Sequence, residues 1–461
     1  MSAEHRLSVR AEDSTAEITV YDGGFNRVGR GVGGYDGVHA DGLYEIRVRT
    51  AGTQEQRLLS LAHDETVDID PVAFKSPVPL AISASADEAH QAAVARASRA
   101  PIGLGTGSAL LIVVRDRQMA NKSPEGSPAS GLSLLDIEGR PVFDVGRKAT
   151  VDSSGRSPIA AVCLQVDPGA YRLRLDLGNG KARERSLFAS TGWTTQCFMV
   201  RRSSADGCAA DLAQGSLSLG RLGRPFVSSD VALRLGEAAL DALANSRNVT
   251  QAATQALLNA KFEDPILGLL VGHLLLRDAP GDVMLEAVIA NMRRLLGPEH
   301  PDVQALAVGA AAADVPTVVT WLPMLRASWD LIVLRTLTEP SLVPPESLAA
   351  RLATCVLPSS PWLVWDGGHD CSVRLGASKM AALRGYLGGA NASKPISARR
   401  ASIHPEGLPA AADVARALGP PSPAVPSGAL EAGDREALAR SLGLTGPVLD
   451  EMLVRIGDTV P

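Results

Sequence analysis

The segment Gly103-Leu-Gly-Thr-Gly-Ser108 has the composition of a loop that binds phosphate, and a hydrophobic run follows it. In a P-loop or a dinucleotide-binding fold, the glycines follow a strand and open a helix, so that the phosphate meets free N–H groups at the helix N-terminus. Here the order is reversed, because a helix-forming segment precedes the glycines and Ala109 to Arg115 has the pattern of a buried strand. No Lys-Ser or Lys-Thr directly follows Gly107. We therefore expect a joint between two modules and no nucleotide cofactor.

A histidine and a cysteine lie two residues apart in Trp365-Asp-Gly-Gly-His-Asp-Cys371 and have the chemistry of a base and a nucleophile. In an extended chain, His369 and Cys371 would share a face. Catalytic partners of this kind usually come from distant segments, however, and Asp366-Gly-Gly is a turn signal. A cysteine hydrolase is therefore kept as an alternative, in this form or with Cys371 or Cys355 paired to a remote histidine (His273, His300 or His404).

Metal and serine-hydrolase chemistry find no support in the residue spacing. The eight histidines show no His-x-x-x-His or comparable ligand spacing, and no Gly-x-Ser-x-Gly motif occurs. The five cysteines are widely spaced and form no Cys-x-x-Cys pair, which argues against a zinc ribbon and a thioredoxin-like site. Cys163 and Cys197 lie in apolar runs and are predicted to be core residues. We expect no metal site and no cofactor.

Large apolar side chains are the remaining candidates for an interaction site, because only 4% of the chain is aromatic. Trp193, Trp362 and Trp365 are predicted to be core residues or, alternatively, anchors at the rim of an interface. A short helical tail at the C-terminus is expected either to dock onto a partner or to fold back onto its own domain. Its candidate contact residues are Leu444, Leu449 and Leu453.

Length, charge and the absence of export signals limit the class of protein. A length of 461 residues predicts several domains, and a net charge of −5 argues against a nucleic-acid partner. The first residues lack the basic and apolar pattern of a signal peptide. Apolar runs such as Pro265 to Leu276 are shorter than the about 20 residues that span a bilayer. Together with the cysteine pattern, these features predict a cytoplasmic protein that contacts neither nucleic acid nor membrane.

The N-terminal half reads as two copies of one β module. Gly42-Leu-Tyr-Glu-Ile-Arg-Val48 is matched by Gly169-Ala-Tyr-Arg-Leu-Arg-Leu175, and each is followed by a glycine turn and a charged strand. The alternation predicts that Tyr171, Leu173 and Leu175 face a core while the arginines between them face solvent. A shared motif with a shared order of flanking strands favours a duplicated β-sandwich.

The corner Pro168-Gly-x-Tyr171, which leads into the closing strands, resembles that of transthyretin-like sandwiches, the carboxypeptidase-regulatory-like and PEGA modules. The resemblance covers roughly residues 15–70 and 109–201. It implies non-catalytic modules that act as spacers, ligand platforms or interaction domains.

From Val227 onward the sequence becomes helical, with breaks at Gly297-Pro298, Pro316, Pro340 and Pro344-Pro345. The predicted class is therefore multi-domain, β then α, with two β-sandwich modules, a helical domain and a small helical tail. The domains are expected at 1–80 (first sandwich), 81–108 (helix and linker), 109–205 (second sandwich), 225–386 (helical domain), 387–428 (flexible linker) and 429–461 (tail).

These features predict a non-enzymatic scaffold or adaptor that acts through protein–protein interactions as an accessory component of a larger bacterial system. Two alternatives remain: a hydrolase with a cysteine-based site in the helical half, and a carbohydrate- or peptide-binding β-sandwich protein. The sequence names no partner.

Overall fold

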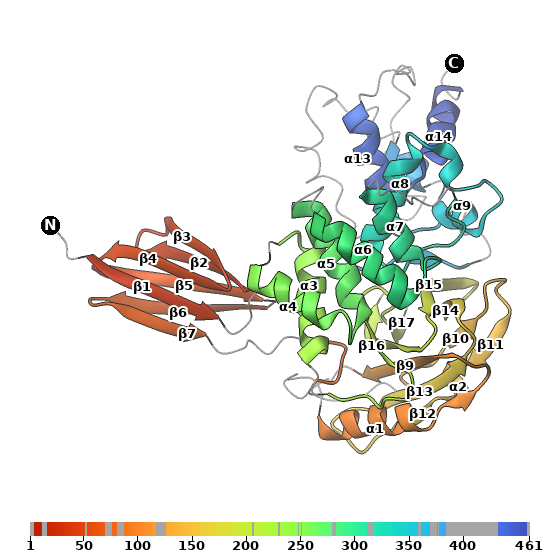
Figure 1. Cartoon of the computed structure of the whole chain (residues 1–461), viewed down its shortest axis with the longest axis horizontal. Coiled ribbons are helices and arrows are strands. Elements are labelled where there is room, and N and C mark those ends of the chain that lie inside the picture. Colours follow the sequence, from red (N-terminus) through yellow and green to blue (C-terminus); the bar gives the residue numbers. More distant parts are fainter. Residues whose placement is uncertain are drawn as a thin grey trace. The chain divides into compact units, whose positions relative to one another are not determined.

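The computed structural model has a β-rich N-terminal half and a helical C-terminal half, which confirms the predicted fold class (Figure 1). None of the helices it describes is long and apolar enough to cross a membrane. The described residues are 4–11, 16–50, 53–69, 76–80, 87–116, 126–204, 207–228, 231–247, 249, 251–278, 283–310, 318–357, 361–368, 376, 378–383 and 432–458.

The chain divides into two compact units, and both use segments that are distant in the sequence. The first unit comprises Met1–Ser130, Val145–Gly169 and Ala189–Gly297. The second unit comprises Gly131–Asp144, Ala170–Phe188 and Pro298–Pro461.

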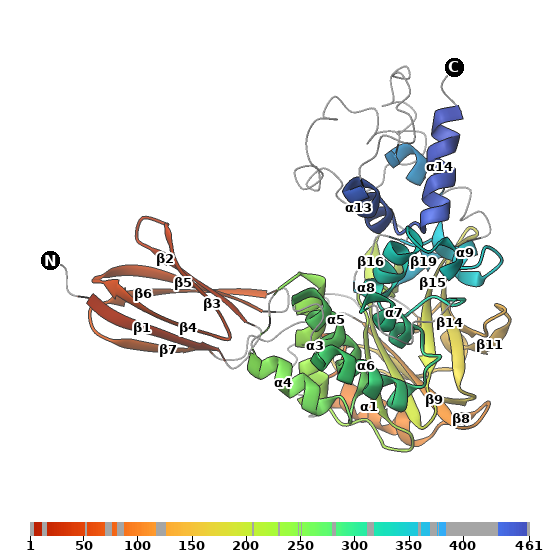
Figure 2. The same cartoon turned by 45° about the horizontal axis from the view of Figure 1, so that its top comes forward.

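The first strands of the first unit form a sandwich of two sheets (Figure 2). One sheet has the order β4-β1-β7, with β1 Glu4–Ala11, β4 Gly34–Ala40 and β7 Glu65–Ile69. The other has the order β3-β2-β5-β6, with β2 Glu17–Asp22, β3 Arg27–Val32, β5 Gly42–Thr50 and β6 Thr53–Leu61. The period-two alternation places Ile46 and Val48 of β5 in one core with Leu7 and Val9 of β1.

The next strands of the chain contribute to two larger sheets. In the first unit the order is β12-β13-β9-β16-β17, with β18 also paired to β16 and β8 to β13. In the second unit the order is β11-β10-β14-β15-β19. The bounds are β8 Ile102–Gly103, β9 Ser108–Asp116, β10 Leu132–Leu135, β11 Pro141–Asp144, β12 Thr150–Asp152, β13 Ile159–Val166, β14 Gly169–Gly178, β15 Lys181–Ala189, β16 Trp193–Ser204, β17 Gly207–Ala210, β18 Ser216–Arg221 and β19 Val364–Asp366.

The two sets of strands share one pairing scheme. In the N-terminal set, β1 pairs antiparallel with β4 and parallel with β7, while β2 pairs with β3 and β5, and β5 pairs with β6. In the later set, β9 pairs antiparallel with β13 and parallel with β16, while β10 pairs with β11 and β14, and β14 pairs with β15. The repeated Gly-x-Tyr motif therefore opens the strand with the same neighbours in both sets.

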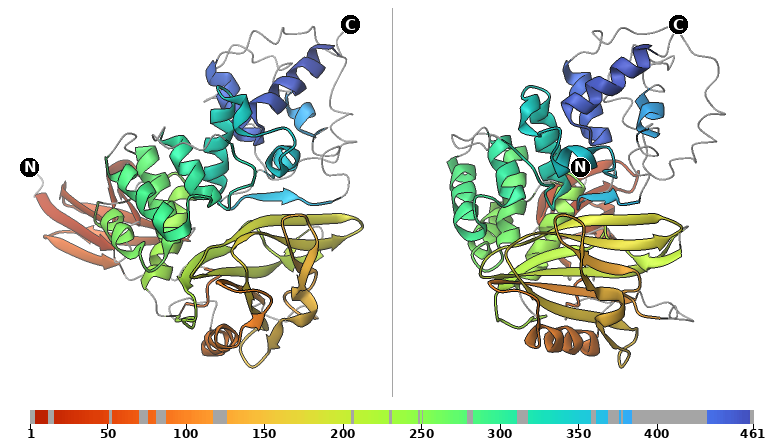
Figure 3. Two further views of the ribbon diagram at one scale, coloured as in Figure 1. Left: turned by 45° about the vertical axis from the view of Figure 1, so that its right-hand side comes forward. Right: turned by 90° about the vertical axis from the view of Figure 1, so that its right-hand side faces the viewer.

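Helix α1 (Glu88–Arg99) precedes the glycine-rich segment, as the sequence predicts. The sequence offers Ser85 or Asp87 as the cap of this helix, and Asp87 is the one that accepts a hydrogen bond from the amide of His90 and begins the helix. Figure 3 shows α1 lying on the sheet of the first unit, where Val94 packs with residues of β9 and β13. The glycine segment then leads directly into β9, and the Asp167 carboxylate accepts a bond from the Thr106 amide. This order of helix, loop and strand is that of a joint.

Helices α6 and α8 end just before the predicted breaks at Gly297-Pro298 and Pro340, whereas Pro316 lies outside the described residues. The sequence also predicts a helical piece over 316–338, but α8 begins only at Arg326, and the Asp302 carboxylate accepts bonds from the amides of Met324 and Leu325 just before it. The bounds are α3 Val231–Ala244, α4 Gln251–Ala260, α5 Pro265–Asp278, α6 Val283–Leu296, α7 Pro301–Gly309, α8 Arg326–Thr336, α9 Leu348–Ala353, α13 Ala432–Leu442 and α14 Gly446–Asp458, with short elements α2 Val145–Lys148 and η1 Pro340–Leu342.

Candidate functional site

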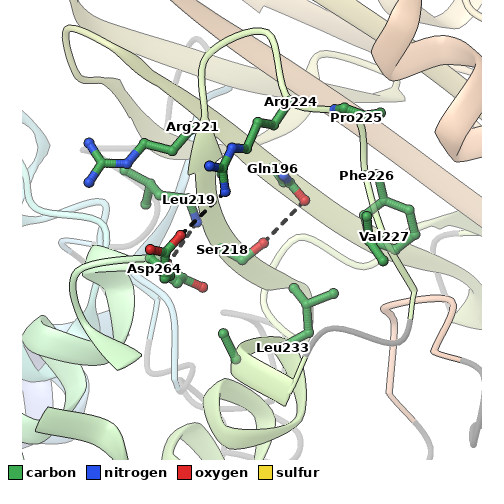
Figure 4. A pocket seen from close by; sticks show the side chains of 13 residues that line it. Gln196, Ser218, Leu219, Arg221, Arg224, Pro225, Phe226, Val227, Leu233 and Asp264 are labelled. Carbon is green, nitrogen blue, oxygen red and sulfur yellow. Dashed lines mark hydrogen bonds and ion pairs between the residues drawn. The ribbon is translucent and has the colours of Figure 1, made fainter. Parts of the chain in front are cut away.

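A small pocket lies in the first unit between β18, the segment that follows it, and α3 (Figure 4). Its apolar wall includes Phe226, Val227 and Leu233, and Gln196 and Arg224 are among its polar groups. The cavity volume is about 130 Å³, whereas pockets for small-molecule ligands usually enclose about 300–1,000 Å³. The pocket is therefore too small to support an enzyme site or a sugar-binding cleft.

Most of the charged groups around this pocket already have partners. Asp264 accepts hydrogen bonds from the amides of Leu219 and Ile266, at 2.9 and 3.0 Å. The Arg221 guanidinium stacks on the Trp193 ring, 4.1 Å from its centroid. Arg224 lies 3.5 Å from a carboxylate oxygen of Glu263, and both side chains are well exposed. These contacts hold β18 against the start of α5 and do not form an acid–base pair.

Trp193 has a structural role in the first unit. Its side chain is 2% exposed, and its indole N–H donates to the carbonyl of Leu295 at 2.9 Å. This tryptophan is part of the core and does not offer its ring to a partner.

Trp365 belongs to a buried charged cluster in the second unit. Its indole N–H donates to a carboxylate oxygen of Glu184 at 3.1 Å, and Glu184 is fully buried. Glu184 also accepts from Arg172 at 2.8 Å and from Arg174 at 2.9 Å, while Arg174 donates to the carbonyl of Gly367.

This cluster shows that one expectation from the sequence was wrong. The arginines were expected to face solvent, but Arg172 and Arg174 are only 14% and 28% exposed, because both donate to the buried Glu184 and Arg174 also donates to the carbonyl of Gly367. Trp362 is also fully buried and packs under the guanidinium of Arg185.

The C-terminal helices pack into the core of the second unit. Arg326 donates to the carbonyl of Arg440, and the Trp329 indole donates to that of Gly443. The sequence predicts that Gly443 ends a helix, and this glycine has φ +64°, the left-handed conformation that commonly does so. The candidate docking residues are thus enclosed by their own unit, at exposures of 0%, 0% and 6% for Leu444, Leu449 and Leu453.

The residues proposed for a cysteine hydrolase are not brought together in the described part of the chain. His369, Cys371 and His404 lie outside the described residues. Cys355 is disulfide-bonded, so its sulfur is not available as a nucleophile. Structural disulfides are rare in reducing compartments, so this bond gives no support to the cytoplasmic location expected from the sequence. No group of three or more potential metal ligands occurs among the described residues.

The cysteine environments lead to a labelling prediction. Cys163 and Cys197 are free thiols at 4% and 0% exposure, and burial raises the pKa of Cys163 to about 11. An alkylating reagent should leave both unmodified in the native protein and modify both in denaturant, because only exposed thiolate reacts. Cys355 should react only after reduction. Peptide mass mapping checks this, and fast native labelling of Cys163 would contradict it.

Two buried histidines predict how stability depends on pH. Burial lowers the pKa of His273 to about 4 and that of His300 to about 3, whereas an unfolded histidine titrates near 6.5. Below pH 6.5 the two histidines bind protons in the unfolded chain but not in the folded chain. Their contribution to the free energy of unfolding is therefore fully present above pH 6.5 and falls as the pH drops toward 4.

The expected slope is about 1.4 kcal/mol per pH unit for each histidine. His300→Asn keeps an acceptor near Nδ1, which accepts from the Asp302 amide, and it should remove the His300 share of the slope. Urea unfolding at pH 7.5 and pH 5 measures the difference. If the dependence of unfolding free energy on pH is the same in this variant as in the wild type, His300 takes up its proton in the folded chain as readily as in the unfolded chain, and the prediction is wrong.

Lys379 is a perturbed group that the sequence did not single out. Burial lowers its pKa to about 7, and its ammonium donates to the carbonyl of Ala353 at 3.3 Å. Ala353 is the last residue of α9, so the lysine contacts the carbonyl end of that helix, where a cation is favourable.

The outer face of the N-terminal sandwich differs from the corresponding face of the later set. Two residues separate β5 from β6, and two separate β14 from β15, so positions are counted from the start of β6 and β15. The fourth residues are Gln56 and Glu184, and the sixth residues are Leu58 and Ser186. Ser186 is fully buried and accepts from the indole of Trp321, whereas Leu58 is 71% exposed.

We call the surface made by the exposed Leu43, Gln56 and Leu58 and the partly buried Glu45 and Arg47 the outer face. Pairing of Leu43 with Ser60, Glu45 with Leu58 and Arg47 with Gln56 puts these side chains on one side of the sheet. Leu43 is 53% exposed, and Arg47 forms a bidentate pair with Glu45 while stacking on Tyr21. No sequence signal marked this face, because the exposure of Leu58 depends on what the rest of the chain leaves uncovered.

Comparison with solved structures gives only distant likenesses. The TIE protein of Bacillus anthracis is 11% identical, over 41% of this chain and 32% of that one, with a TM-score of 0.17. GBS52, the minor pilin of Streptococcus agalactiae, is 10% identical over 42% and 93%, with a TM-score of 0.13. A titin A168169 structure is 9% identical over 41% and 96%, with a TM-score of 0.11.

The match spans about a third of the length of the TIE protein. At these TM-scores none of the likenesses indicates a function for this chain. No protein-family model and no curated protein sequence matches the chain.

Proposed function

We propose that this chain is a non-enzymatic scaffold that binds another protein through the outer face of its N-terminal sandwich. The observation that carries this proposal is the contrast between Leu58 and Ser186 at corresponding positions, at 71% and 0% exposure. In the second unit the face is covered by Trp321 and Trp365 of the same chain. The N-terminal copy presents the corresponding face uncovered by described residues.

The chemistry of the outer face suits a protein partner. Exposed apolar side chains beside a paired arginine and carboxylate are typical of a protein interface, where an apolar centre is surrounded by polar groups. An aromatic side chain of the partner would pack on Leu43 and Leu58, as Trp321 and Trp365 of this chain pack on the corresponding face of β15. The N-terminal sandwich shares the Gly-x-Tyr motif with the later strands, and the transthyretin-like character inferred from their corner fits this role, since it implies a non-catalytic interaction domain.

A photo-crosslinking amino acid at position 58 of the full chain tests the proposal in the cells that make the protein. We expect a covalent adduct with one discrete protein, lost when Leu43→Asp is added. The control places the same amino acid at Val283, which is 78% exposed at the start of α6 and lies outside the face. Equal recovery of adducts from both positions, or no adduct with another protein from position 58, overturns the proposal.

A further inference from the structure

Strand β6 is the last strand of its sheet, and its free side has a counterpart that is occupied. In the order β11-β10-β14-β15-β19, the corresponding strand is β15, and its outer edge is paired with β19. That pairing is antiparallel and sets Arg183 opposite Asp366 and Glu184 opposite Trp365. Among the described residues, no strand pairs with the free side of β6. An uncovered edge offers unpaired N–H and C=O groups to another strand.

The sequence of β6 is complementary to itself in the antiparallel direction. If a two-fold axis passes through Gln56, each Glu55 lies opposite Arg57 of the partner subunit, and each Gln54 lies opposite the partner's Leu58. Two oppositely charged cross-strand pairs result, each contributing about 0.2–1 kcal/mol. The β15–β19 edge uses the same device, because Arg183 faces Asp366 there.

The side chains involved are available for such pairing. Glu55 makes no ion pair within the described residues, and Arg57 donates only to a backbone carbonyl, that of Asp68, at 3.2 Å. Gln54, Gln56 and Arg57 are all exposed. Among the described residues, the edge therefore carries one carboxylate without an ion pair and one guanidinium with N–H groups left to donate to a carboxylate.

We propose that β6 pairs antiparallel with β6 of a second copy of this chain, so that the two four-stranded sheets join into one continuous sheet. The interface is isologous, with Gln56 on the axis and the Glu55–Arg57 contact made twice. This dimer would place two outer faces on one extended sheet and so present a bivalent surface to the proposed partner. The dimer goes beyond the proposed scaffold function and does not depend on it.

Charge reversal in the full-length chain provides the test, read by sedimentation velocity over a wide range of concentrations. Glu55→Lys and Arg57→Glu each place like charges opposite one another twice, and each should weaken the dimer by at least about tenfold. An equimolar mixture of the two variants restores both opposite-charge contacts and should form the heterodimer. The double variant Glu55→Lys/Arg57→Glu should dimerise with itself. Glu4→Lys, an exposed change on β1, should leave association unchanged.

The mixture also controls for folding, because a chain that regains association must still present an intact edge. A wild-type chain that is monomeric at every concentration overturns the proposal, as does a dimer that both single variants leave intact. So does an edge found paired with a strand of a different protein. An adduct of position 58 with another protein alongside a monomeric chain would sink the dimer alone, whereas a β6 dimer without such an adduct would sink the scaffold proposal alone.

Discussion

Replacing Glu184 with glutamine should lower the free energy of unfolding by about 3 kcal/mol, because it leaves two arginines without their carboxylate. Glu184 is fully buried, and it accepts from Arg172, Arg174 and the Trp365 indole. A glutamine amide of the same shape keeps one acceptor but turns its NH₂ group toward a cation. The solvent that reaches Arg174, at 28% exposure, keeps the expected loss near the lower end of the range for a broken buried pair.

A second variant, Gly367→Ala, tests the same carboxylate through a steric contact from the neighbouring backbone. A Cβ at Gly367 would lie 2.6 Å from a carboxylate oxygen of Glu184, closer than real contacts allow. Gly367→Ala should therefore displace Glu184 and destabilise the second unit as well. Gly376→Ala is the matched control, since a Cβ there meets no atom within 4 Å.

Chemical denaturation of the wild type and the four variants measures both effects. Glu138→Gln serves as the charge control, because Glu138 is 58% exposed and its pair with Arg140 is worth little. If the free energy of unfolding of Glu184→Gln lies within about 0.5 kcal/mol of the wild-type value, the Glu184 carboxylate does not stabilise the second unit.

Local patterns in the sequence predicted the elements well. The cap at Asp87, the end of a helix at Gly443 and the repeated Gly-x-Tyr strand all depend on neighbours within a few residues. The order of β strands followed by helices came from the change in hydrophobic periodicity near residue 225. Because such signals are local, they can be recognised in the sequence without knowledge of the tertiary contacts.

The burial of Arg172 and Arg174 could not be predicted from local patterns in the sequence. Alternation correctly put them on the face opposite Leu173, but on that face they meet Glu184 and the carbonyl of Gly367, and Gly367 comes nearly two hundred residues later in the chain. The short strand Val364–Asp366 carries a turn signal just after it and gives no alternation of its own. The candidate outer face was missed for the same reason, since exposure of Leu58 is a property of the assembled chain.

In the first unit, Asp116→Ala should lower the free energy of unfolding by about 3–5 kcal/mol, because a single carboxylate pairs with a buried arginine there. Asp116 and Arg201 lie opposite each other on β9 and β16, at 1% and 3% side-chain exposure. The pair is bidentate, with distances of 2.5 and 2.6 Å, and Arg201 also donates to the carbonyl of Ser127. Removing the carboxylate leaves a guanidinium that water does not reach.

A double-mutant cycle separates the interaction from the cost of the stranded charge. Asp116→Leu/Arg201→Met removes both charges while keeping apolar volume, and it should recover most of the stability that Asp116→Ala loses. Urea unfolding of the wild type, Asp116→Leu, Arg201→Met and the double variant gives the coupling energy. If the double variant is no more stable than Asp116→Ala, the unpaired charge is not what destabilises the single variant. The pair then stabilises the fold by fixing the register of β9 against β16.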